Sequence, residues 1–313
     1  MIDRSNDIRR MCEEWIEAAH SGGNGSIAIG GSTEKFRLWR NGIQFHEVDL
    51  NSVRTAITYL TKTLLLKGYN TIIDFDHKLL WSWLAQVTIG NNTPNMLNEY
   101  QFNELFASVA RCSLAGVRNP QDTREEWDRK NQLEKLQEHN SIEMARSSNL
   151  LLSYMVFPLL EAICKTTCHS YMNEVGEVIM AFSIPRKNGS PRLYGIGSKC
   201  SSLRDVLFLL ESCVTGNTLS YLSEMKLHIN WLTGSTEHQY DTIFDWRNSS
   251  LHGHASHSTI GGTILGWCYQ VALDGFENDY ETRAASALQF AIRESQNYTQ
   301  SGYRDRYSYY PPV

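Results

Sequence analysis

Apolar residues recur at helical spacing along almost the whole chain, and this feature restricts the fold more than any other. The clearest case lies at 141–171, where residues three or four positions apart form one apolar stripe: Leu150, Leu151, Tyr154, Phe157, Leu160, Ile163 and Cys164. Similar spacing predicts further helices over 3–20, 52–67, 77–87, 99–115, 123–138, 202–213, 219–231, 240–247, 257–273 and 280–295. The sequence therefore predicts a mostly α-helical protein.

Signals for strands are confined to short stretches. Three strands are expected near the N-terminus, at 26–29, 35–39 and 43–48. The pair Asn41–Gly42 favours a hairpin between the last two, because both residues tolerate positive φ. A second extended stretch is expected at 177–184, before the turn-forming sequence RKNGSPR. Ser202 and Asp205, three residues apart, predict a capping box at the start of the next helix.

The chain of 313 residues is long enough for two domains. A heavily charged helix expected at 123–138 precedes the apolar stripe, which places a boundary near residue 140. We therefore expect an N-terminal helical segment with a small β-hairpin over 1–140 and a helical bundle over 141–297. The tail at 298–313 is rich in Tyr and Arg without apolar periodicity, and it is expected to be flexible.

Composition limits the classes of partner and location. The net charge of −5 gives no overall basic field, so nucleic acid would have to bind through a local patch. The N-terminus lacks the apolar core of a signal peptide, and the apolar stretch 150–164 looks too short and too polar to span a bilayer. Seven scattered cysteines fit a reducing compartment, and the single Cys164–Cys168 pair is a poor zinc signal. A cytoplasmic protein without membrane, metal or cofactor is expected.

The segment DWRNSSLHGHASH at 245–257 carries the most chemistry. It brings Arg247, Asn248 and His252 within about two helical turns, since each residue rises roughly 1.5 Å. Arg can hold a phosphate through a bidentate contact. Histidine can exchange a proton near neutral pH, and an amide can orient either group. These three residue types suit cleavage of an RNA backbone without a metal.

The motif formed by Arg247, Asn248, three further residues and His252 followed by Gly resembles the R-x4-6-H signature of HEPN domains. These are helical bundles of prokaryotic toxins, abortive-infection proteins and CRISPR-associated ribonucleases. The resemblance covers roughly 141–297, and a long first helix carries an acidic residue, Glu161, that could support the site. It implies endoribonuclease activity that needs no metal, RNA as substrate, a homodimer that completes the site, and a regulatory partner in a defence or toxin system.

Three other interpretations stay open. Arg247 and Asn248 could instead cap the end of a helix, with His252 packed in the following turn. His252, His254 and His257 form an HxHxxH cluster that a loop could gather around a metal ion. Toxins of this family that are silenced by nucleotide transfer carry Tyr two residues after the His, where this chain has His254. A HEPN-like bundle without catalysis, used for interaction or ligand binding, is the alternative function.

Overall fold

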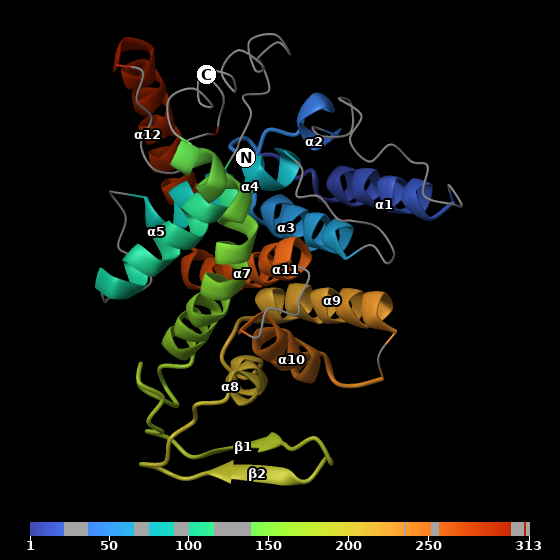
Figure 1. Cartoon of the computed structure of the whole chain (residues 1–313), viewed down its shortest axis with the longest axis vertical. Helices are drawn as coiled ribbons and strands as arrows, with labels where there is room; N and C mark the ends of the chain where they lie inside the picture. The colour runs from blue at the N-terminus through green and yellow to red at the C-terminus, as the bar shows by residue number, and fades with distance from the viewer. Residues whose placement is uncertain are drawn as a thin grey trace.

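The structure is a computed structural model, and it describes residues 1–21, 37–65, 75–90, 100–115, 139–234, 236–251, 257–301 and 310. Within these ranges, the chain forms eleven helices and one two-stranded antiparallel sheet, and about 70% of it is helical (Figure 1). The prediction of a mostly α-helical fold with a small β-hairpin is therefore confirmed, although the observed hairpin lies within residues 182–194 and not within 1–140.

Apart from the short helix at Arg37–Arg40, which lies where a strand was predicted, the described helices fall where the apolar spacing predicted them, although the ends of several differ by a few residues. The helix predicted at 123–138 lies outside the described residues. The first five helices are α1 (Ser5–Ser21), α2 (Arg37–Arg40), α3 (Leu50–Leu64), α4 (Phe75–Ile89) and α5 (Tyr100–Leu114). The remaining helices are α7 (His139–Thr167), α8 (Leu203–Leu210), α9 (Gly216–Thr233), α10 (Gln239–Leu251), α11 (His257–Ala272) and α12 (Tyr280–Ser301), with a 3₁₀ turn at Leu273–Phe276.

Helix α11 forms the centre of the core. Every residue from Ile260 to Leu273 is buried, and the helix packs against both α7 and α3. Glycines allow this close approach, because a Cβ at Gly262 would lie 2.6 Å from Leu64 Cδ1 and one at Gly266 would lie 2.3 Å from Thr61 Oγ1. The central helix therefore needs glycine where it crosses α3.

Helices from both sides of residue 140 bury their side chains in one continuous core. Helix α5 packs on α7, α3 packs on α9 and α11, and α4 packs on α12. The division at residue 140 stays a prediction, and this packing argues against two units that fold independently.

Helix α7 contains a long apolar stretch. The segment Ser147–Thr167 is long and apolar enough to cross a membrane by composition alone, so the expectation that it was too short is not upheld. However, 56% of the most apolar part of this segment is buried inside the protein. Pro158 lies inside the helix, as the sequence predicted.

The prediction of a hairpin at Asn41–Gly42 is wrong for the residues that the structure describes. Arg37–Arg40 is a short helix instead of a strand, and the stretch after Gly42 forms one isolated bridge, between Val48 and Ile2. Gly42 does have a positive φ of 78°. It serves there as a helix C-cap, because the amide of Ile43 donates to the carbonyl of Leu38 (3.0 Å) and that of Gly42 to the carbonyl of Trp39 (3.0 Å). Residues 26–29 lie outside the described ranges.

The one sheet of the described chain lies between α7 and α8 in the sequence. Strands β1 (Phe182–Pro185) and β2 (Pro191–Tyr194) pair antiparallel, with Phe182 opposite Tyr194. The rings of these two residues stack with centroids 4.9 Å apart. The turn contains Gly189 at a φ of 79°, within the RKNGSPR sequence. The hairpin lies beyond α8, at the lower end of the molecule in Figure 1.

One residue of the tail that was expected to be flexible is firmly held. The Tyr310 ring is fully buried, and its hydroxyl lies 2.9 Å from Nδ1 of His46. Its carbonyl oxygen accepts a hydrogen bond of 2.6 Å from Nε2 of Gln86. Helix α12 also continues to Ser301, into the range assigned to the tail. The end of the chain is therefore anchored at Tyr310.

Candidate functional site

Two of the predicted site residues, Arg247 and Asn248, lie side by side near the end of α10. Both side chains are half-buried, and neither makes a hydrogen bond or ion pair with any other described residue. Helix α10 continues to Leu251, so both residues lie in its last two turns. Their polar groups are thus uncommitted in the part of the chain that the structure describes.

The remaining members of the motif cannot be placed beside them. His252 and His254 lie outside the described residues, while His257 is the first residue of α11. No group of three metal-ligating side chains occurs within the described ranges, which exclude two of the three histidines of the HxHxxH cluster. The metal interpretation of that cluster therefore stays open.

Glu161 already has a partner on its own helix. Its Oε1 lies 2.7 Å from Nζ of Lys165, one turn further along α7, and both side chains are largely buried. Helix α7 also contacts α10, which carries Arg247. The supporting role of Glu161 stays a prediction, and any such role would compete with the ion pair to Lys165.

Lys165 borders a shallow groove of about 640 Å³ at the end of α7. Its other lining residues are Thr166, His169, Met172, Asn173, Glu174, Val175 and Ile179. Val175 and Ile179 are among the exposed large apolar side chains of the described chain. The groove therefore adjoins the extended segment that leads into the hairpin.

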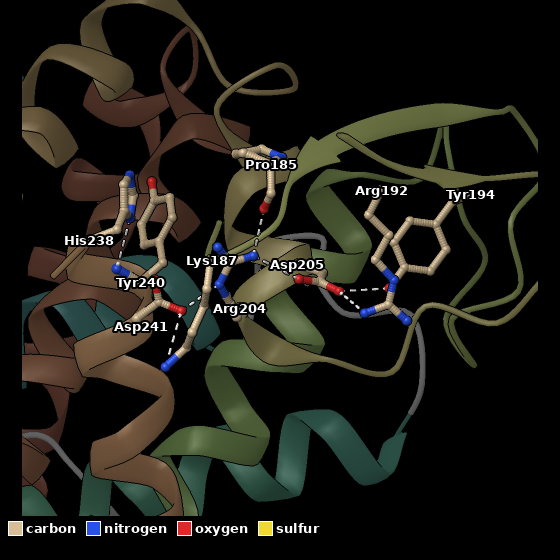
Figure 2. Close-up of polar contacts among 9 residues, drawn as sticks. All are labelled: Pro185, Lys187, Arg192, Tyr194, Arg204, Asp205, His238, Tyr240 and Asp241. Carbon is tan, nitrogen blue, oxygen red and sulfur yellow. Dashed lines mark hydrogen bonds and ion pairs between the residues drawn. The ribbon is translucent and has the colours of Figure 1, made fainter. Parts of the chain in front are cut away.

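The sequence did not reveal the row of alternating charges that joins the hairpin to α8 and α10 (Figure 2). Nε of Arg204 donates to Oδ1 of Asp241 across 2.5 Å, and its Nη1 donates to the carbonyl oxygen of Pro185 across 2.8 Å. Nη1 of Arg204 also donates to Oδ1 of Asp205 across 3.2 Å. Both carboxylates are almost completely buried. Arg204 therefore neutralises two buried acids at once.

The hairpin supplies the outer cations of this row. Nη1 of Arg192 and the hydroxyl of Tyr194 donate to Oδ2 of Asp205 across 2.9 Å and 2.7 Å. Nζ of Lys187 lies 3.8 Å from Oδ1 of Asp241. These contacts attach the hairpin to the helices through charge, beside the buried apolar side chains of Phe182 and Ile184.

This network also corrects the prediction of a capping box. Ser202 does precede the first residue of α8, but its side chain makes no capping hydrogen bond. The carboxylate of Asp205 is turned to Arg192, Tyr194 and Arg204 instead. Ion pairs between segments that are distant in the sequence have no fixed spacing. No local sequence pattern could therefore have identified the network around Asp205.

His238 and Tyr240 lie beside this row. The His238 ring packs on Phe208, with centroids 4.5 Å apart, and its Nδ1 accepts from the amide of Tyr240 across 3.2 Å. Burial lowers the pKa of His238, and the nearby Lys226 lowers it further. The hydroxyl of Tyr240 donates to Glu211 across 2.7 Å, and burial raises its pKa well above the usual range. Tyr240 is therefore held as a neutral donor.

No protein-family model, curated protein or solved structure matches this chain.

Proposed function

We propose that this protein is a metal-independent endoribonuclease of HEPN type, acting in the cytoplasm within a defence or toxin system. The observation that carries the proposal is the pair Arg247 and Asn248, adjacent and without described partners in the last turns of α10. An arginine whose charge is not used by the fold is available for a phosphate. The mostly helical fold is compatible with the bundle that the motif implies.

The hairpin provides the local basic patch that an acidic protein needs in order to bind RNA. The stretch 178–199 contains four basic residues and no acidic one, although the whole chain has a net charge of −5. These residues, all exposed, are Arg186, Lys187, Arg192 and Lys199, and we call them the basic hairpin surface. Among the described residues, Arg186 and Lys199 have no ion-pair partner.

The basic hairpin surface also approaches the helix that carries the motif. Lys187 contacts Asp241 in the first turn of α10. Asn248 follows Asp241 by seven residues and lies on the same helix face, about 10 Å further along the axis. This span suits one or two phosphate groups of an RNA strand.

The proposed chemistry needs one cation and one proton carrier in each site. Arg247 would hold the scissile phosphate, His252 would take or give a proton, and Asn248 would orient them. The ribose 2′-oxygen forms a bond to phosphorus, and the bond from phosphorus to the 5′-oxygen breaks. The products carry a 2′,3′-cyclic phosphate and a 5′-hydroxyl. Pairing of two copies would bring two motifs together, so we propose a homodimer.

The test is cleavage of a labelled RNA by the full chain in excess EDTA. The native chain should produce fragments with cyclic phosphate ends. The rate of cleavage should fall by about 10²–10⁴-fold in Arg247→Ala and in His252→Ala. Arg293→Ala, on the exposed side of α12, is the matched control and should cleave like the native chain. Cleavage that requires zinc and all three histidines would replace this proposal with the metal site.

The alternative function is an interaction module without catalysis. It is favoured by the aliphatic side chains beside the basic hairpin surface, since Leu193 is 80% exposed and Ile196 is 75% exposed. Exposed aliphatic residues in a group commonly mark a contact with another protein. If no RNA is cut and the Arg247→Ala chain folds normally, this alternative becomes the better description.

A further inference from the structure

The hairpin forms the tip of a longer two-stranded ribbon. Beyond the paired strands, the amide of Val178 donates to the carbonyl of Ser198 across 2.9 Å. One residue further from the turn, an isolated bridge pairs Glu177 with Lys199. We call residues 175–200 the ribbon. It lies beyond α8 at the lower end of the molecule (Figure 1).

The two faces of the hairpin within this ribbon differ in burial. Phe182 and Ile184 on one face are buried, and β1 packs against α8. On the other face, Ser183 lies opposite Leu193, and both side chains are exposed. Leu193 is 80% exposed, although the solvated face of an antiparallel pair is commonly polar. The uncovered face therefore presents a large aliphatic side chain to its surroundings.

Exposed apolar side chains are concentrated on the ribbon. Five of the eleven exposed large apolar side chains of the described chain lie within 175–200, with exposed fractions from 42% to 80%. These five, which we call the exposed apolar group, are Val175, Ile179, Met180, Leu193 and Ile196. None of them is aromatic, so none can stack on a nucleic-acid base. RNA binding through charge therefore leaves the exposed apolar group unused.

The ribbon also carries a positive charge. Its basic residues are the four of the basic hairpin surface, and Glu177 is its one acid, which gives a net charge of +3 for the ribbon against −5 for the whole chain. Lys187 and Arg192 contact buried carboxylates, but their side chains are still 60% and 49% exposed. The ribbon therefore combines exposed cations with exposed apolar side chains.

We propose that the ribbon binds the surface of membranes that contain anionic lipids. Peripheral binding of this kind needs apolar side chains that enter the boundary between headgroups and acyl chains, and basic side chains at the headgroups. The exposed apolar group supplies the first, and the basic hairpin surface supplies the second. Such binding needs no helix that spans the bilayer. It goes beyond the proposed ribonuclease activity and does not depend on it.

A lipid surface fits the ribbon better than a protein partner does. A stable protein interface buries about 800 Å² on each side, and aromatic residues commonly anchor it. The ribbon is only two strands wide, and its exposed apolar group has no aromatic residue. A fluid bilayer needs no matching shape, and the anionic cytoplasmic leaflet complements the positive charge of the ribbon.

The first test is sedimentation of the full chain with phosphatidylcholine vesicles that contain or lack phosphatidylserine. We expect the chain to bind only the vesicles with phosphatidylserine, and to bind them less strongly as salt is added, because salt screens the basic side chains. Arg186→Gln removes one of these charges and should weaken binding about fivefold. Arg293→Gln on α12 is the matched control for the lost charge, and it should bind like the native chain.

Substitution within the exposed apolar group separates insertion into the membrane from a purely electrostatic contact. Leu193→Asn should weaken vesicle binding about tenfold, because its side chain no longer gains from transfer out of water. Leu227→Asn on α9 is the matched control, since it removes a leucine that is 67% exposed, and it should bind like the native chain. All of these positions are exposed, so circular dichroism should show the native spectrum for each variant.

Two results with vesicles would overturn the proposal: the native chain binds both kinds of vesicle equally or neither, or Leu193→Asn and Leu227→Asn weaken binding alike. A third is a dimer of the native chain without lipid that becomes a monomer in Leu193→Asn, as light scattering would reveal. The exposed apolar group would then contact a second copy of the chain. If a variant loses its fold, the comparison of the two kinds of vesicle with the native chain still decides.

Discussion

Arg204 and Asp241 form a nearly buried ion pair, with 2.5 Å between Nε of the guanidinium and Oδ1 of the carboxylate. This contact joins α8 to α10, and Arg204 extends it to Asp205 and to the hairpin carbonyl of Pro185. The pair therefore sets the position of the helix that carries Arg247 relative to the basic hairpin surface. Its integrity matters for any function that uses both.

Removal of one partner from this pair should be costly. Asp241→Ala leaves the buried Arg204 guanidinium without its nearest anion, and we expect a loss of about 3–5 kcal/mol in the free energy of unfolding, measured with urea. Lys187→Ala is the control, because its side chain is 60% exposed and it contacts the same carboxylate at 3.8 Å. Its substitution should change stability by no more than about 1 kcal/mol. Equal effects of the two substitutions would contradict the central role of Arg204.

The basic hairpin surface should contribute to RNA binding through charge. The double substitution Arg186→Glu and Lys187→Glu should weaken RNA binding and reduce the slope of log K against log salt by roughly 0.7 for each lost phosphate contact. Arg293→Glu on α12 changes the net charge by −2, half the change of −4 in the double variant, at a distant exposed position, and it should leave the slope nearly unchanged. RNA binding that is equally weakened by both variants would indicate a general charge effect.

The close packing of α11 against α3 can be tested by substitution of Gly266. A Cβ at this position would meet Thr61 Oγ1 at 2.3 Å inside the core. Gly266→Ala should therefore lower the free energy of unfolding by about 1–3 kcal/mol, despite the better helix propensity of Ala. Gly195→Ala has nothing within 4 Å and should be neutral. Adding Thr61→Ala should recover part of the loss, and the absence of any recovery would place the strain elsewhere.

The anchor at Tyr310 predicts a stabilising role for the end of the chain. Its ring packs against Trp39, Phe45 and Trp83 with centroids 5.6–5.9 Å apart. Tyr310→Ala should cost about 3–5 kcal/mol in thermal or urea unfolding. Tyr310→Phe keeps the ring and loses the hydrogen bonds of its hydroxyl, among them the one to Nδ1 of His46, so it should cost about 1 kcal/mol for each lost hydrogen bond. A neutral Tyr310→Ala would show that the tail is not held.

Buried His228 should make the protein less stable in acid. Burial lowers its pKa from 6.5 to about 3, with a further contribution from the nearby Lys62. The unfolded chain takes up this proton below about pH 6.5 while the folded chain does not, so the stabilisation is present above 6.5 and is lost as the pH falls toward 3. The slope should be at most about 1.4 kcal/mol per pH unit. In His228→Phe, the free energy of unfolding, measured with urea, should depend less on pH between about pH 3 and pH 6.5. An unchanged pH dependence would contradict the role of His228.

The sequence predicted the helices well because their apolar stripes are local patterns. It misplaced the N-terminal hairpin because Asn41–Gly42 specifies a positive φ, which a helix C-cap needs as much as a tight turn does. The candidate residues Arg247 and Asn248 come from the resemblance of their segment to a family motif, and their role stays a prediction. The Arg204 network could not be predicted, because it joins residues from segments that only the folded chain brings together.

The central position of α11 has a consequence for how the chain is made. Its partner α3 ends at Leu64, and α11 begins at His257, which is 257 − 64 = 193 residues later. At a ribosomal rate of roughly 5–20 residues per second, α11 is synthesised about 10–40 s after α3. The face of α3 that packs on α11 stays uncovered by α11 during this time. During this interval, the nascent chain exposes a surface that other nascent chains or chaperones can bind. Slow synthesis should therefore lower the yield of soluble protein more than it does for folds whose contacts are local.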